Sequence, residues 1–178
     1  MPYKGVLMFN VYETPEKSGH SQPRVAALLA CKGNLMAASW HMPISKSPFR
    51  YAVAVREENY THALLHAHGS FTLNFLPYEY YETVDLMGRL HGNECDKFAA
   101  SKLKSQQVDI SGNHLLDASD FIYECNVCDT YTNGDHTVFI ADVVRIYVNA
   151  HQSKEPLLFL GRGHYAAACK EIMVEKPQ

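Results

Sequence analysis

Apolar runs bounded by Gly, Asn and Pro recur along the chain and predict β-strands. The run 24–31 (RVAALLAC) is predicted to be a buried strand, and Lys32-Gly33-Asn34 after it supplies a hairpin turn. Residues 35–41 are predicted to form the return strand, and the apolar run 49–56 a third strand. The pattern therefore predicts three consecutive antiparallel strands in the first third of the chain.

Two helices are predicted in the middle of the chain. The first covers 60–68, with Asn59 as its N-cap and Gly69 as its C-terminal stop. Helical spacing predicts that its buried stripe consists of Ala63, Leu64 and Ala67. The second helix is predicted over 78–90.

Three further strands complete the predicted fold. Residues 70–75 alternate between apolar and polar, and 121–131 and 137–148 are long strands joined by a turn at 133–135. Six or more strands, mostly linked by hairpins, with two or three short helices indicate a β-barrel or sandwich rather than a parallel βαβ fold. The length of 178 residues fits a single domain over 1–178.

Charge and composition exclude several classes of protein. The chain has 16 Lys plus Arg against 19 Asp plus Glu, and this net charge of −3 disfavours a nucleic-acid-binding domain. No apolar stretch reaches the roughly 18 residues of a transmembrane helix. The first residues lack the apolar core and cleavage site of an export signal. We therefore expect a cytoplasmic protein that binds neither nucleic acid nor membrane.

The five cysteines fit a reducing compartment, because an odd number without an export signal favours free thiols. Cys125 and Cys128 form a C-x-x-C pair inside a predicted strand, where residues three apart point to opposite faces. A redox C-x-x-C normally opens a helix, and a zinc site needs a second pair. We therefore interpret both cysteines as structural.

Common catalytic motifs are missing from the sequence, which has no G-x-G-x-x-G after a strand, no P-loop, no H-E-x-x-H and no G-x-S-x-G. His62 and His66 have the i, i+4 spacing that can hold a metal ion on a helix. No Glu follows His62 and no third ligand is evident nearby. Histidines on the helix surface are the favoured interpretation, and no metal site is predicted.

Two segments carry the candidate chemistry. The first, 33–41 (GNLMAASWH), places small side chains on a strand, so that a planar ligand can approach backbone N–H and C=O groups closely. A barrel strand whose small residues serve packing alone is the alternative.

The second segment, 55–61 (VREENYT), ends a strand with Arg56 and starts a helix with Asn59, Tyr60 and Thr61. Free N–H groups, the helix dipole and an arginine together make a phosphate site. An ordinary capped helix with Arg56 on the surface is the alternative. A flat ring beside one strand and a phosphate at the next helix start indicate a mononucleotide-like ligand, and FMN fits best.

Six short runs match, in order, those of a known family. They read N-x-M-A-x-S-W-H, R-x-x-x-Y-T, G-x-F-x-x-N, D-K-F, G-D-H-T-x-x-I and P-L-L-F-x-x-G, at 34–41, 56–61, 69–75, 96–98, 134–140 and 156–161. The sequence resembles the flavin reductase-like, FMN-binding split-barrel proteins, which include flavoredoxins and the reductase components of flavin-dependent monooxygenases. The resemblance covers approximately residues 24–165.

This resemblance implies a mainly β fold, a split β-barrel of Greek-key-like antiparallel strands with short helices, and a homodimer with FMN near the subunit interface. By position, the residues implied to lie along the isoalloxazine ring are Met36, Ala37, Ala38, Ser39, Trp40 and His41, with Asn74 and Leu76 beside it. Those implied to hold the phosphate and ribityl chain are Arg56, Tyr60 and Thr61, together with Asn59 at the helix start and Lys97. His136 is the implied catalytic residue near the nicotinamide, and a strand-end histidine without that role is the alternative.

One run departs from the family pattern. Many members have S-G-R-D-V-D-K-F before a helix, whereas residues 91–98 read H-G-N-E-C-D-K-F. The missing Ser and Arg remove polar contacts to the phosphate or to the partner subunit.

The segments and the resemblance together predict an FMN-binding flavoprotein that acts as an NAD(P)H-dependent flavin oxidoreductase, with NADH or NADPH as the reductant. Hydride transfer requires no acid–base pair, which agrees with the missing catalytic motifs. The first alternative is an FMN-binding electron carrier of the flavoredoxin type, reduced by a partner protein. The second is a metal-using enzyme built on the histidine-rich segments.

Overall fold

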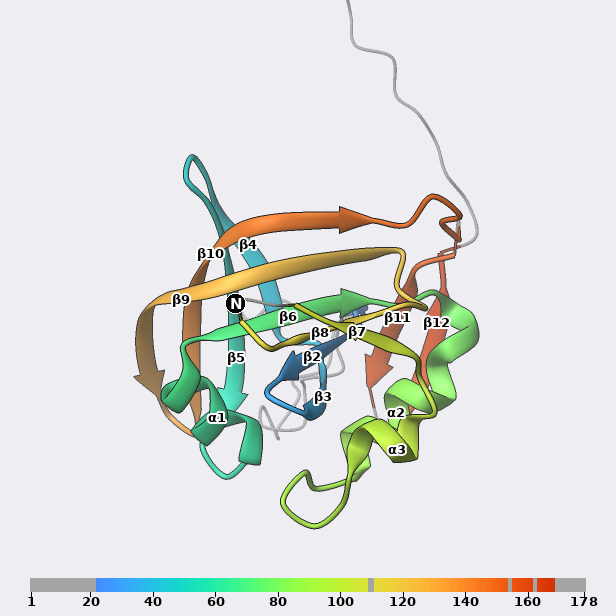
Figure 1. Ribbon diagram of the computed structural model, residues 1–178, viewed down its shortest axis with the longest axis horizontal. Coiled ribbons are helices and arrows are strands. Elements are labelled where there is room, and N and C mark those ends of the chain that lie inside the picture. The colour runs from blue at the N-terminus through green and yellow to red at the C-terminus, as the bar shows by residue number, and fades with distance from the viewer. Residues whose placement is uncertain (1–21, 109–110, 154, 162, 169–178) are drawn as a thin grey trace, which may run out of the picture.

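A seven-stranded antiparallel sheet forms the main body of the molecule (Figure 1). The computed structural model describes residues 22–108, 111–153, 155–161 and 163–168. The strand order is β3-β2-β6-β9-β10-β5-β4. The strands in chain order are β2 (Ala27–Cys31), β3 (Asn34–Ala38), β4 (His41–Lys46), β5 (Phe49–Arg56), β6 (Ser70–Phe75), β9 (Phe121–Asn133) and β10 (His136–Val148).

The sheet is a barrel that is split between its two edge strands, β3 and β4. Ser39 and Trp40 connect these strands in the chain, and the Ala54 N–H donates to the Trp40 carbonyl at 2.8 Å. Because β6 lies between β2 and β9, the strand order is not sequential. The mainly β, Greek-key-like split barrel predicted from the sequence is thus confirmed.

The predicted pairing of the first three strands is wrong in one respect. The return strand ends at Ala38, and His41 begins a new strand that forms a hairpin with β5. β3 therefore pairs with β2 and not with β5. Turn residues specify the β2–β3 hairpin locally, but the neighbour of each edge strand is decided by how the whole sheet closes.

The predicted strand 24–31 also divides between two sheets. Its first residues form β1 (Arg24–Val25), which pairs with β11 (Leu157–Gly161) in a sheet completed by β12 (His164–Ala167). Two short strands, β7 (Ser105–Gln107) and β8 (His114–Leu116), form a separate pair.

Three α-helices accompany the sheets in the described part of the chain. They are α1 (Tyr60–His68), α2 (Tyr81–Arg89), which follows the 3-10 turn η2 (Tyr78–Tyr80), and α3 (Lys97–Ser101). Both predicted helices are therefore present. α2 and α3 lie together against β3, at the lower right of Figure 1.

The ends of α1 agree with the prediction, whereas its buried face does not. Gly69 ends the helix in the left-handed conformation at φ 63°, and Asn59 occupies the N-cap position without a side-chain capping bond. Thr61 and Leu65 are the buried residues of α1, and Ala63 and Ala67 are exposed. The helix is therefore rotated relative to the predicted stripe, because Leu65 packs into the barrel core.

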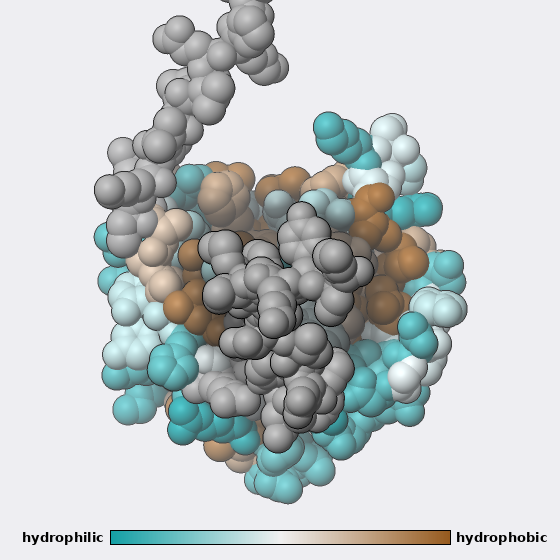
Figure 2. All heavy atoms as spheres, turned by 180° about the vertical axis from the view of Figure 1, so that it is seen from behind, coloured by the Kyte–Doolittle hydropathy of each residue, from teal (hydrophilic) through white to brown (hydrophobic). Residues whose placement is uncertain are grey.

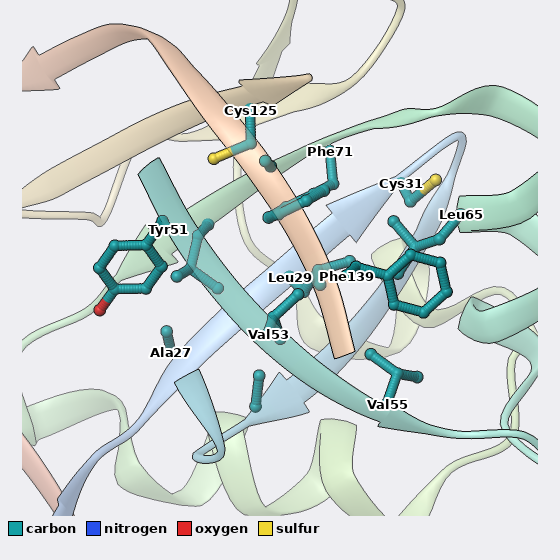
Figure 3. Packing of buried hydrophobic residues seen from close by; sticks show 13 residues of the cluster. Ala27, Leu29, Cys31, Tyr51, Val53, Val55, Leu65, Phe71, Cys125 and Phe139 are labelled. Atoms are coloured by element: carbon teal, nitrogen blue, oxygen red, sulfur yellow. The ribbon is translucent and has the colours of Figure 1, made fainter. Parts of the chain in front are cut away.

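The barrel core and a second, outer cluster share β2. Leu29 packs inside the barrel with Phe71 and Phe139 (Figure 3). Leu28, on the opposite face of the same strand, packs with Met87 of α2. Both faces of β2 are covered, which explains why its sequence is continuously apolar instead of alternating.

The cysteines lie as the strand geometry predicts. Cys125 is buried and Cys128 is exposed, and the four cysteines in the described ranges are free thiols. Burial raises the pKa of Cys31 to about 11 and that of Cys125 to about 12. The fifth, Cys169, lies outside the described residues. No helix among the described residues is long and apolar enough to span a membrane.

Candidate functional site

The free edge of β3 is the first component of the candidate site. In an antiparallel ladder, a residue directs its N–H and C=O to the same side. The Leu35 carbonyl accepts from Lys97 Nζ at 2.7 Å and so points away from β2. Ala37, two residues further on, has the same orientation, and no described residue bonds to its backbone groups outside the ladder. One donor and one acceptor are therefore available on this edge.

A cavity of about 410 Å³ lies next to this edge. Its walls include Ala37, Ala38 and Ser39, the α2 backbone at Gly88, and Phe159 from the second sheet. A Cβ atom at Gly88 would lie 3.4 Å from the Ala37 Cβ, so the small residues allow α2 to pack closely against β3. The volume is in the range of small-molecule sites, and three of the predicted ring residues line it.

The rim of this cavity contains polar residues that the sequence analysis missed. Tyr165 donates to Asp85 at 3.2 Å, and Arg89 forms an ion pair with the same carboxylate. Burial, with the charge of Asp85, raises the pKa of Tyr165 to about 12. No motif indicated these residues, because α2 and β12 are about 80 residues apart in the chain.

The start of α1 lies next to the start of β3. Asn34 Nδ2 donates to Thr61 Oγ1 at 2.9 Å, and Asn59 Nδ2 contacts Met36 Sδ at 3.8 Å. Asn34 Oδ1 is buried without a partner among the described residues, and a Cβ atom at Gly92 would lie 2.0 Å from it. The structure therefore brings the two predicted segments together and packs the 91–95 loop closely over their junction.

Arg56 lies at the exposed end of β5 beside this junction. Its guanidinium is 2.8 Å from Glu58 and 3.4 Å from Asp135. Tyr60 is exposed, and Thr61 is buried. The first turn of α1 contains no acidic residue, so its free N–H groups form the positive end of the helix dipole, whereas the charge of Arg56 is balanced by its two carboxylate partners.

His136 and Trp40 form an aromatic stack near Arg56, which is the ladder partner of His136. Their ring centroids are 4.6 Å apart, with 22° between the planes. His136 Nδ1 lies 2.6 Å from Asp135 Oδ1, and this bond lowers the pKa of Asp135. His136 pairs with Arg56 across the β5–β10 ladder. The predicted catalytic histidine therefore lies next to the arginine that is predicted to bind the phosphate.

Three predicted ligand contacts lie inside the fold. Asn74 is fully buried and bonds to the Leu28 carbonyl at 3.1 Å and to the Leu116 N–H at 3.0 Å. Leu76 belongs to the outer apolar cluster. Lys97 is 4% exposed, and burial lowers its pKa. The structure gives all three a structural role, and their contacts to a ligand remain predictions.

His41 contacts β5 and β1 rather than the Trp40–His136 stack. Its Nδ1 accepts from the Tyr51 hydroxyl at 2.9 Å, and its Nε2 donates to the Val25 carbonyl at 3.0 Å. Burial raises the pKa of Tyr51 to about 12, which keeps this hydroxyl a donor. The neutral imidazole is therefore fully bonded, and burial lowers the pKa of His41.

We expect acidification to destabilise the protein through His41. The unfolded chain takes up this proton near pH 6.5, and the folded chain only at lower pH. Below that value the unfolded state binds more protons, so the free energy of unfolding falls as the pH falls. Between about pH 7.5 and about pH 5.5, the free energy of unfolding measured in urea should fall less for His41→Gln than for wild type. The exposed His68→Gln is the control, and an equal loss in all three proteins would assign the effect to other groups.

The spaced histidines do not form a metal centre with other described residues. His62 Nε2 bonds to Thr137 Oγ1 at 2.9 Å, and the His62 and His66 rings both pack on Phe139. Among the described residues, no group of three or more His, Cys, Asp or Glu is placed to hold a metal ion. The residues that the structure describes therefore supply no third ligand for the metal site that the metal-enzyme alternative requires.

Comparisons with known proteins agree with this architecture. The model of the flavin reductase like domain family matches residues 20–168. An uncharacterized protein of Archaeoglobus fulgidus is 30% identical over 118 residues, which are 65% of this chain and 65% of that protein. The chain spans 52% to 65% of the length of the curated relatives that it matches.

Two solved structures show the same fold. An FMN-binding protein from Thermus thermophilus, with bound 1-cyclohex-2-enone, has a TM-score of 0.78 at 22% identity over 98% of this chain and 96% of its own. An NADH:FAD oxidoreductase from Streptomyces globisporus has a TM-score of 0.81 at 18% identity over 92% of this chain and 99% of its own. Since the family model covers most of the 178 residues, the chain belongs to the flavin reductase like domain family.

Proposed function

We propose that this chain binds FMN and acts as an NAD(P)H-dependent flavin oxidoreductase. The observation that carries the proposal is the cavity of about 410 Å³ at the free edge of β3, with the start of α1 at the other end of that strand. Family membership supports it, as do the structural neighbours, one described as FMN-binding and the other as an NADH:FAD oxidoreductase.

The residues at the site fit FMN chemically. The cavity offers apolar walls for the ring, and the free N–H and C=O of Ala37 can bind the polar edge of the ring. The start of α1 and Arg56 offer donors to a phosphate. β3 rises about 13 Å over its five residues, so ring and phosphate sites are separated as in an extended mononucleotide.

When bound, FMN supplies the chemistry that accepts and releases a hydride. The chain itself binds and orients the reactants. His136 donates from Nδ1 to Asp135, which leaves Nε2 to bind a nicotinamide carboxamide or to hold a proton. A ring bound in the cavity would displace water from the apolar part of its wall, which would strengthen the polar contacts made there.

We also propose that the functional unit is a homodimer. Large apolar side chains are exposed on β4 and β10, namely Met42, Ile44, Val144, Ile146 and Val148. Figure 2 shows hydrophobic side chains over the upper half of the face seen from behind, on both sides of the part drawn in grey. Exposed apolar patches of this kind mark interaction surfaces.

We expect NADH or NADPH to reduce the bound flavin. In an anaerobic stopped-flow experiment, FMN-loaded protein should lose its oxidised flavin absorbance on mixing with one of the two nucleotides. Failure with both, together with reduction by a ferredoxin, would replace the reductase by the electron-carrier alternative.

The absorbance spectrum of the purified protein separates flavoproteins from metal enzymes. We expect the bands of an oxidised flavin, either as purified or after FMN is added. A colourless protein that retains zinc or iron and does not bind added FMN would contradict both flavin interpretations.

A further inference from the structure

A second cavity, of about 330 Å³, lies on the other side of the β1 segment from the candidate flavin cavity. Val25 lines the second cavity and Ala26, the next residue, lines the first, because adjacent residues of an extended chain direct their side chains to opposite faces. The two cavities have no described lining residue in common. The chain itself therefore separates a ligand in the second cavity from a bound flavin.

Aromatic rings form a large part of the wall of the second cavity. They come from β5, β6 and β9, namely Tyr51, Phe75, Phe121 and Tyr123. The Tyr123 ring packs edge-to-face with Phe75 and with Tyr51, at centroid distances of 5.1 Å and 5.3 Å. His41 bonds to the Tyr51 hydroxyl and to the Val25 carbonyl, and so it fixes two of the wall residues. The wall is therefore preformed and largely apolar, as in small-molecule sites.

One carboxylate interrupts this apolar wall. Asp120 is the single charged residue among the described lining residues, and it is 8% exposed. Its Oδ1 accepts from the Ser153 N–H at 2.8 Å. Its Oδ2 accepts from no described residue and is not enclosed by protein, so it is open to the cavity that Asp120 lines. No Lys, Arg or His in the described ranges forms an ion pair with this carboxylate.

These features select one chemical class of ligand. A carboxylate that is largely removed from water and has no cation beside it is costly, so a positive charge bound there is stabilised. Aromatic rings attract the same charge, and the apolar wall favours a ligand with an apolar body. A metal ion fits poorly, because it needs several oxygen ligands and the described residues bring no such group together. An ammonium group on an apolar body meets all of these conditions.

We propose that the second cavity binds a small organic ammonium cation, whose charged group bonds to Asp120 and whose apolar body packs on the aromatic wall. The site is independent of the proposed flavin chemistry, and binding is expected with and without FMN.

The test is a titration of the full chain with three probes of nearly the same shape, followed by the NMR shifts of the backbone amides. The probes are phenethylamine, which carries an ammonium group, phenethyl alcohol, which is neutral, and phenylacetate, which carries a negative charge. We expect the amine to bind about 10- to 150-fold more tightly than the alcohol, the range of a hydrogen bond to a charged group. Phenylacetate should bind least. The shifted amides should include those of Asp120, Phe121 and Ser153.

Substitutions locate the probe in the cavity. Asp120→Asn removes the charge and keeps an acceptor for the Ser153 N–H, so it should weaken amine binding by the same factor and leave the affinity for the alcohol unchanged. Asp117→Asn, at an exposed aspartate three residues earlier, is the matched control and should bind all probes as wild type. Val25→Trp should fill the cavity and weaken binding of the amine and the alcohol alike.

Several outcomes would overturn the inference. Equal affinity of the wild type for amine and alcohol would exclude recognition by Asp120, and this comparison requires no variant. Failure of all three probes to bind would show that the cavity is not a ligand site. Amine that is displaced by FMN would place the probe in the flavin cavity instead. Selective amine binding by a protein that does not bind FMN would support the inference while contradicting the proposed function.

Discussion

Replacing Arg56 by alanine should weaken FMN binding by about 1.5–3 kcal/mol, the range of a hydrogen bond to a charged group. Arg56 is the last residue of β5, four residues before α1 begins, and the first turn of α1 has no acidic residue. Its guanidinium is exposed, so several donors remain available beside the contacts to Glu58 and Asp135. The effect should appear as an increase in the FMN dissociation constant of about 10- to 150-fold.

Riboflavin and a second arginine provide the controls for this substitution. Riboflavin lacks the phosphate, so its affinity should be the same for wild type and Arg56→Ala. Arg145 on β10 is also exposed and also paired with a carboxylate, Glu124, so Arg145→Ala should bind FMN as wild type. An unchanged FMN dissociation constant in Arg56→Ala would show that the phosphate binds elsewhere.

Replacing Lys97 by methionine should destabilise the folded protein by about 2–4 kcal/mol, because two buried acceptors lose their donor. The Lys97 ammonium donates at 2.7 Å to the Leu35 carbonyl and at 2.7 Å to the Met87 carbonyl. The first acceptor lies on the free edge of β3, and the second belongs to the last turn of α2, where no intrahelical partner exists. Methionine has nearly the same length, so the main change is the loss of the donor.

Urea unfolding measures this effect, with the exposed Lys104→Met as the control. Wild-type stability in Lys97→Met, together with weaker binding of FMN but not of riboflavin, would instead support the phosphate contact implied by the family resemblance. The two substitutions thus separate the roles of the two cations. Arg56 is expected to change ligand affinity and Lys97 to change folding.

Local signals were sufficient for the elements whose conformation depends on adjacent residues. Lys32 and Gly33 adopt positive φ values of 47° and 72°, as the predicted hairpin turn requires. Gly69 ends α1 at the predicted position. The buried face of α1 was predicted incorrectly, because helical spacing defines a possible apolar stripe but not the side on which the barrel core will lie.

The same distinction applies to the candidate site. The segments 34–41 and 56–61 were identified from sequence, and the structure brings them together through Asn34 and Thr61. Asp85 and Tyr165 at the cavity rim could not be identified, because no local pattern links two elements that meet only in the folded chain. The ligand contacts of Asn74 and Lys97 remain predictions. Both side chains bond to buried carbonyls, and a polar residue in a family motif has the same sequence signal whether it faces a ligand or a carbonyl.

By itself, the sequence determined a mainly β fold, the hairpin turns of β2–β3 and β9–β10 and the ends of α1, and it indicated two segments that are expected to bind a ring and a phosphate. These depend on side-chain type and on spacing within one element. Only the tertiary structure decided that β3 is a free edge, that a cavity lies beside it, and that Trp40 stacks on His136 outside that cavity. Each of these depends on contacts between residues far apart in the chain, which form when the sheet closes and α2 packs against it.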